Sequence, residues 1–99
     1  MSQQNAVSND YGTLILTRDF TSEVIDAFEI MNSIVGVQYS PLAVQLQAKN
    51  GINYTFFCQA QPAHPDAKAY MAKVTISASL PDEDKKTHYS ITQIEHLLP

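Results

Sequence analysis

The sequence contains few cysteines, few charged residues and few basic residues, and each of these features excludes some classes of protein. One cysteine among 99 residues cannot form an internal disulfide, so the chain fits a reducing compartment or is indifferent to redox state. Six basic residues against ten acidic ones give a net charge of −4, which argues against a nucleic-acid-binding surface. Charged residues make up 16% of the chain, below the ~25% typical of soluble domains, while the 44% apolar fraction suits a folded globule.

Long apolar runs and targeting signals are also missing. Residues 1–10 lack both the basic start and the apolar stretch of ~7–15 residues that define a signal peptide. No apolar run approaches the ~18 residues that a membrane span requires. We therefore expect a cytoplasmic protein that does not bind membranes. The length predicts a single domain over residues 11–99, preceded by a flexible N-terminal arm over residues 1–10.

The strongest secondary-structure signal is an amphipathic helix over residues 21–35. Thr21 is a typical N-cap, and Phe20 before it is placed to pack on Ile25. Gly36 is a typical residue to end such a helix. Apolar residues recur at steps of three and four, which puts them on one stripe: Phe20, Val24, Phe28, Met31 and Val35.

Strand patterns lie on both sides of this helix. A short apolar and β-branched run at 13–17 precedes it, and four strands follow, near residues 42–47, 52–61, 69–79 and 87–95. Alternation along the first three of these four strands places one set of residues inward: Leu42, Val44 and Leu46; Ile52, Tyr54, Phe56, Cys58 and Ala60; and Tyr70, Ala72, Val74, Ile76 and Ala78.

The resulting order, β-α-β-β-β-β, predicts an α+β fold. One helix among consecutive antiparallel strands cannot form the parallel sheet of nucleotide-binding folds. We expect a twisted antiparallel sheet wrapped across a single long helix, with the other sheet face exposed and carrying Thr, Gln and Phe57. Because alternate turns of a meander project from the same edge, the loops around Asn50 and Pro81 should lie at one end.

The residues that could carry chemistry do not form a recognisable catalytic or metal-binding pattern. Cys58 shares the inward face with aromatic residues, where free cysteine behaves as a buried hydrophobe rather than as a nucleophile. His64, His88 and His96 lack the spacing of metal ligands. The acidic run 82–84 lacks the glycine and the bidentate glutamate of a calcium loop, so we expect a solvated turn. No metal, no cofactor and no enzymatic activity are expected.

Three motifs resemble those of the cystatins. The segment QAKNGINY, residues 47–54, resembles the cystatin signature QVVAGTNY, with Gln47, Gly51, Asn53 and Tyr54 in register. The segment SLPDEDK, residues 79–85, is similar to SLPHENK of the stefins, the intracellular branch of that family. Gly12 lies just before a short strand and a helix, as the N-terminal glycine of the family does. The predicted element order agrees with the cystatin-like fold.

The resemblance implies reversible tight-binding inhibition of papain-like cysteine peptidases. In that mechanism an N-terminal segment and two hairpin loops fill the active-site cleft of the peptidase and cover its thiol. We expect a monomer, and opening of the Asn50–Gly51 hairpin offers a route to a domain-swapped dimer. The peptidase-binding residues carried over by the resemblance are Tyr11, Gly12, Gln47, Ala48, Lys49, Asn50, Gly51, Leu80 and Pro81.

The chain departs from the family at the tip of the first loop. Where the family presents small apolar residues, this chain has Ala48-Lys49-Asn50, and burying a polar group without a partner costs ~1–3 kcal/mol. Together with Phe57 on the exposed sheet face, this departure motivates an alternative: a cystatin-fold binding or assembly module that does not inhibit. An enzyme of cystatin-like fold is less favoured, because such scaffolds are usually longer and enclose a polar pocket. One cysteine and no tryptophan favour the stefin side of the family, or a divergent relative from another lineage.

Overall fold

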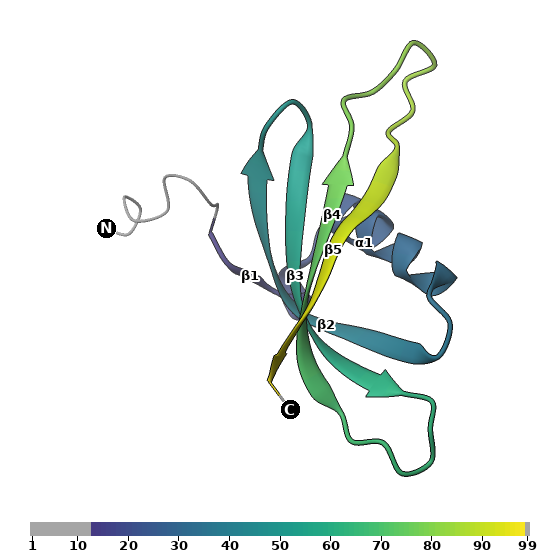
Figure 1. Ribbon diagram of the computed structural model, residues 1–99. Coiled ribbons are helices and arrows are strands. Elements are labelled where there is room, and N and C mark those ends of the chain that lie inside the picture. The colour runs from purple at the N-terminus through teal and green to yellow at the C-terminus, as the bar shows by residue number, and fades with distance from the viewer. Residues whose placement is uncertain (1–12, 99) are drawn as a thin grey trace, which may run out of the picture.

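The computed structural model describes residues 13–98 as one helical segment packed on one face of a twisted sheet (Figure 1). All neighbouring strands are antiparallel, in the order β1-β2-β3-β4-β5. The predicted arm, Tyr11 and Gly12 lie outside the described residues. In chain order the elements are β1 (Ile15–Leu16), the 3₁₀ turn η2 (Thr17–Asp19), α1 (Ser22–Phe28), the 3₁₀ segment η3 (Glu29–Ser33), β2 (Val37–Ala48), β3 (Ile52–Pro62), β4 (Tyr70–Ala78) and β5 (Tyr89–Leu98).

The predicted α+β class and the order of the elements are confirmed, but the single long helix is wrong. Helix α1 has seven residues and continues as the 3₁₀ segment η3. Its N-cap is as predicted, because the Thr21 hydroxyl accepts a hydrogen bond from the Val24 N–H at 3.3 Å. The tighter 3₁₀ turn aligns residues three apart, so Met31 and Ile34 face the core while Val35, expected on the stripe, is 93% exposed.

Strand β2 is longer than predicted, and its inward face is set by a bulge. It begins at Val37 and runs through Pro41, with a register shift between Pro41 and Ala43. Leu42 is the extra residue, so it is 47% exposed instead of inward, while Val44 is fully buried. A bulge near the sheet edge is where a strand tolerates proline, and the Thr17 hydroxyl donates to the Pro41 carbonyl at 2.6 Å.

The core is centred on Phe56 of β3. Its ring meets Phe28 of α1 edge-on at 4.8 Å between centroids, and it stacks near Tyr54 at 6.0 Å. The inward face predicted for β3 is confirmed, with Ile52 partly buried at the start of the strand. No helix within residues 13–98 is both long and apolar enough to span a bilayer.

Candidate functional site

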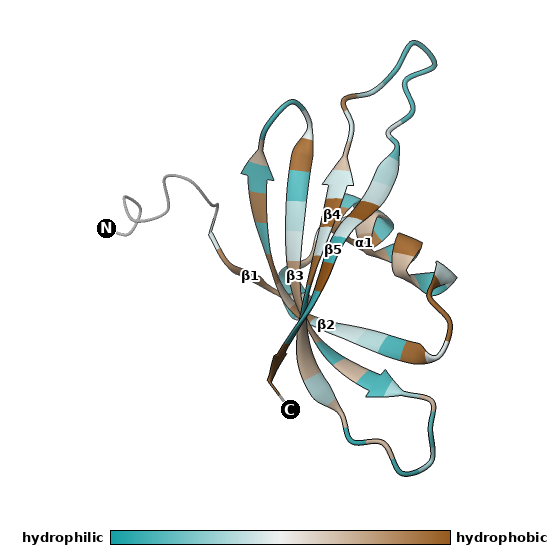
Figure 2. Cartoon of the chain, in the orientation of Figure 1, coloured by the Kyte–Doolittle hydropathy of each residue, from teal (hydrophilic) through white to brown (hydrophobic). Residues whose placement is uncertain are grey.

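Two loops project from the same end of the sheet, as predicted (Figure 1). We call residues 49–51, between β2 and β3, the first loop, and residues 79–88, between β4 and β5, the second loop. Their bases are neighbours because Ile52 pairs with Ala78 across β3 and β4. The tips of both loops are mostly hydrophilic (Figure 2).

The first loop is a tight turn held by its backbone. Asn50 has a φ of 48° and Gly51 a φ of 117°, and the Lys49 N–H donates to the Gly51 carbonyl at 2.9 Å. Such positive φ angles are the ones that an Asn-Gly turn tolerates. Ala48, Lys49 and Asn50 are exposed at the tip. These three residues are therefore free to meet a partner.

Gly51 is constrained a second time by the neighbouring hairpin. A Cβ atom at this position would overlap the carbonyl oxygen of Ala78 at the end of β4. The close approach of the two hairpins therefore requires glycine, in addition to the requirement of the turn. The fold explains Gly51 whatever the loop binds.

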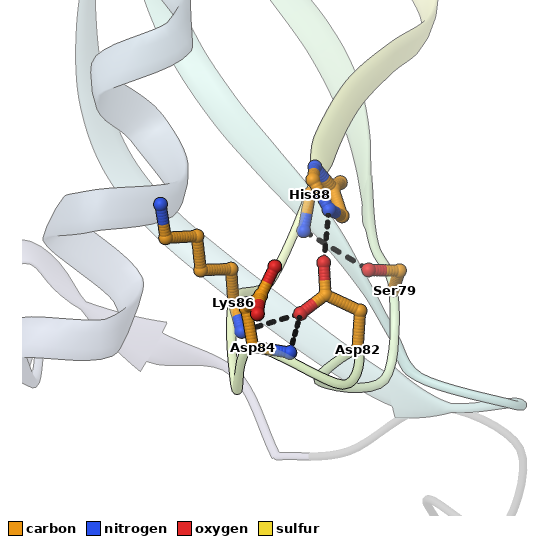
Figure 3. A network of polar contacts seen from close by, with 5 residues as sticks. All are labelled: Ser79, Asp82, Asp84, Lys86 and His88. Carbon is orange, nitrogen blue, oxygen red and sulfur yellow. Dashed lines mark hydrogen bonds and ion pairs between the residues drawn. The ribbon is translucent and has the colours of Figure 1, made fainter.

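The second loop is held by side chains, and Asp82 is at its centre (Figure 3). Oδ1 of Asp82 accepts hydrogen bonds from the backbone N–H groups of Asp84 and Lys86 at 2.8 and 3.0 Å. Oδ2 of Asp82 accepts from Nε2 of His88 at 2.8 Å. At the base of the loop, the Ser79 hydroxyl accepts from the His88 backbone N–H at 2.9 Å. One carboxylate thus joins residues on both sides of the tip.

These hydrogen bonds lower the pKa of Asp82, because they favour its charged form. The Lys86 N–H has the largest effect, followed by the His88 side chain. The run 82–84 is an exposed turn, as predicted, but the sequence reasoning missed its internal order. The available signal was the Pro-Asp pair, since aspartate after proline often hydrogen-bonds the backbone two residues on.

Apart from Ala48, Lys49 and Asn50 at the tip of the first loop, the predicted binding residues that the structure describes separate into two groups. Gly51, Leu80 and Pro81 line a common pocket of about 250 Å³ between the loop bases, with Tyr54 and Tyr89 beside them. Burial raises the pKa of both tyrosines above its ordinary value of 10.0, so their hydroxyls are neutral at neutral pH.

Gln47 lies elsewhere, on the outer sheet face opposite Asn53. It lines a hollow of about 440 Å³ in which amides and hydroxyls, together with Lys73 and Leu97, surround the half-buried Phe57. The exposed sheet face predicted from Thr, Gln and Phe57 is thus confirmed, but Gln47 belongs to this face rather than to the pocket between the loops.

Ser79, Asp82 and His88 are the residue types of a hydrolytic triad, but their geometry differs from one. A triad needs the serine hydroxyl to donate to the imidazole ring, whereas here the Ser79 hydroxyl accepts from the backbone N–H of His88. The ring nitrogen Nε2 is already on Asp82. The arrangement therefore orders a loop and does not activate a nucleophile.

The cysteine and histidine side chains outside the second loop do not form a reactive site either. Cys58 is fully buried, and desolvation raises its thiol pKa to about 12, so it is not a ready nucleophile at neutral pH. His96 stacks on Tyr70 with 4.1 Å between ring centroids. Among residues 13–98, no three His, Cys, Asp or Glu side chains gather as metal ligands.

Comparison with known proteins gives no match. No family model matches the chain, no curated protein matches its sequence, and no solved structure matches its fold. The resemblance to cystatins therefore rests on the three motifs and on the order of the elements.

Proposed function

We propose that the chain is a stefin-like, cytoplasmic inhibitor of papain-like cysteine peptidases, which enters the active-site cleft with its N-terminal segment and its two loops. The observation that carries this proposal is the placement of Gly51 beside Leu80 and Pro81 around one pocket. These residues come from two separate motifs of the resemblance. Their meeting at one end of the sheet supports the proposal.

The exposure of Leu80 supports binding through the second loop. Its side chain is 63% exposed, and full burial of a leucine is worth ~1.5–3 kcal/mol. The internal bonds of both loops hold them in shape beforehand, so little ordering entropy is lost on binding. In the proposed mechanism, the N-terminal segment and the two loops occupy the cleft reversibly and are not cleaved.

Titration of papain with the protein tests the proposal, with a fluorogenic peptide as the substrate. We expect reversible inhibition, and an intact chain by mass spectrometry after prolonged incubation. Leu80→Ala should raise the inhibition constant by ~10-fold or more. Leu42→Ala is the matched control, because Leu42 is also exposed but lies on the β2 bulge, and it should leave inhibition unchanged.

A second function is supported by two departures from the family pattern. Lys49 places a charge at the exposed tip of the first loop, and the outer sheet face offers the hollow around Phe57. Both suit a cystatin-fold module that binds or assembles with other proteins without inhibiting peptidases. No inhibition of papain and of a wider panel of papain-like peptidases at micromolar protein would favour this second function.

A further inference from the structure

Leu80 and Pro81 lie outside the hydrophobic core, whose packing usually fixes an apolar residue. Both are exposed, and they lie in a loop of ten residues that projects beyond the sheet. An exposed segment with few buried contacts opens easily. Some other interaction must hold this pair if it is to present one conformation to a partner.

The structure fixes the chain immediately before and immediately after the pair. Before it, the Ser79 N–H donates to the His88 carbonyl at 2.9 Å, and the Ser79 hydroxyl accepts from the His88 N–H. After it, the Asp82 N–H donates to the Lys86 carbonyl at 3.0 Å, and the Asp82 carbonyl accepts from the Lys85 N–H at 2.8 Å. Leu80 and Pro81 therefore span only the short distance between two anchors.

The second anchor depends on the Asp82 side chain. Its two carboxylate oxygens receive three hydrogen bonds, from Asp84, Lys86 and His88 (Figure 3). Lys85, between these partners, has a φ of 64°, a conformation that is unfavourable for lysine without compensating bonds. Without the carboxylate, the backbone bonds of the turn would have to hold this conformation by themselves.

We propose that Asp82 is a positioning residue, which holds Leu80 and Pro81 in the conformation that they present to a peptidase. The ordering of the loop is a property of the free protein. The effect on inhibition rests on the proposed function. Asp82 itself contacts the loop and acts on binding through Leu80 and Pro81.

Backbone amide exchange, measured by NMR on the free protein, tests the ordering. In Asp82→Ala, the N–H groups of Asp84 and Lys86 lose their acceptor, and we expect their exchange to accelerate at least ~10-fold. Asp82→Asn should restore most of the protection, because its amide oxygen can still accept both bonds. Asp84→Ala is the control, since Asp84 contributes only its backbone N–H to the network in Figure 3. Unchanged exchange in Asp82→Ala would overturn the proposal.

Stopped-flow kinetics with papain test the consequence for binding. Asp82→Ala should dissociate ~10-fold faster with a similar association rate, because tuning one interface acts mostly on dissociation. Asp82→Asn should return close to the wild-type rate. Asp66→Ala should match the wild type, because Asp66 is an exposed aspartate in the β3–β4 connection, outside both loops. A merely structural role would instead lower the melting temperature of Asp82→Ala, which we expect to stay within ~3 °C of the wild type.

The two measurements separate the failure of this inference from the failure of the proposed function. If the wild type does not inhibit papain, the proposed function fails for that peptidase, and amide exchange still decides whether Asp82 orders the loop. If the wild type inhibits, and Asp82→Ala loses amide protection without any change in dissociation, the positioning role is overturned while the proposed function stands.

Discussion

The two loops at the same end of the sheet keep their shapes by different physical means. The first loop has three residues and depends on its backbone: a positive φ at Asn50, and a glycine pressed against the Ala78 carbonyl. The second loop has ten residues and depends on the Asp82 carboxylate, which accepts hydrogen bonds from three other residues of the loop.

This difference determines what happens when each loop is altered. The first loop is built into the contact between β3 and β4, so disturbing it should cost the stability of the whole domain. The second loop projects beyond the sheet, so disturbing its network should loosen the loop while the core remains folded. A constraint shared with the core acts globally, whereas a constraint confined to a loop acts locally.

The largest effect is expected for Gly51→Ala. A left-handed φ costs ~1–2 kcal/mol for alanine, and forcing a Cβ against the Ala78 carbonyl adds ~1–3 kcal/mol. We expect urea unfolding to show a loss of ~3 kcal/mol in total. Gly36→Ala is the matched control, because Gly36 also has a positive φ, of 94°, but has nothing within 4 Å of the added Cβ. Equal losses in the two variants would mean that the close approach of the hairpins does not matter.

The buried thiol of Cys58 offers a second way to distinguish a disturbance of the whole domain from one confined to a loop. Its pKa is raised to about 12 by burial. The stabilisation that this shift gives the folded state is therefore fully present below the ordinary value of 9.0, and it is lost as the pH rises through about 12. At pH 8, a thiol reagent should label the folded protein only when the core opens.

Labelling of Cys58 should therefore distinguish a global change from a local one. Gly51→Ala should label ~100-fold faster than the wild type, since ~3 kcal/mol corresponds to about two factors of ten in the open population. Asp82→Ala should label at the wild-type rate, because its network does not reach the core. Fast labelling of Asp82→Ala would show that the second loop supports the whole fold.

The sequence predicted the first loop better than the second because the first is a local feature. Asn50-Gly51 between two alternating strands is sufficient to predict a tight turn at that position. The Asp82 network joins residues up to six positions apart, and it forms only because the loop backbone adopts one particular irregular conformation. A periodic sequence pattern does not predict such a conformation, so only the Pro-Asp turn signal was available.

The same reasoning explains where the fold prediction failed. The alternation along β3 was sufficient to assign its buried face, because that strand lies between two long partners. The predictions for the helix and for β2 were wrong at the places where tertiary packing overrode the regular spacing of apolar residues along the sequence. A 3₁₀ segment turned Val35 outward, and a bulge turned Leu42 outward. Gln47 was assigned to the binding loop from its motif, although strand alternation places it on the opposite face from Leu46 and therefore outside the core.

A smaller effect, on binding, is expected from Lys49→Ala in the first loop. The variant removes the charge that peptidase binding would desolvate, while it keeps Asn50, whose φ of 48° would be strained in alanine. Inhibition of papain should strengthen by ~10-fold, mainly through slower dissociation. Lys68→Ala is the control, because Lys68 is an exposed lysine in the β3–β4 connection. An unchanged or weaker affinity would mean that Lys49 has an acidic partner on the peptidase, or that the first loop does not enter the cleft.

The smallest effect is expected from protonation of Asp82, and it should be confined to the second loop. The Lys86 N–H, the His88 side chain and the Asp84 N–H favour the carboxylate, so the pKa of Asp82 lies below its ordinary value of 3.8. Since the folded loop favours the charged form, its order is fully present above pH 3.8 and is lost as the pH falls through the lowered pKa.

An NMR titration of the Lys86 amide proton should report this protonation directly. Its chemical shift should change with a midpoint below pH 3.8, while the amide signals of the buried β3 residues keep their positions. Asp82→Asn, which cannot ionise, should show no such transition at Lys86. A midpoint at or above 3.8 would mean that the carboxylate does not hold these hydrogen bonds in solution. In that case, the second loop would depend on its backbone bonds and on the Ser79 hydroxyl, and the contrast between the two loops would largely disappear.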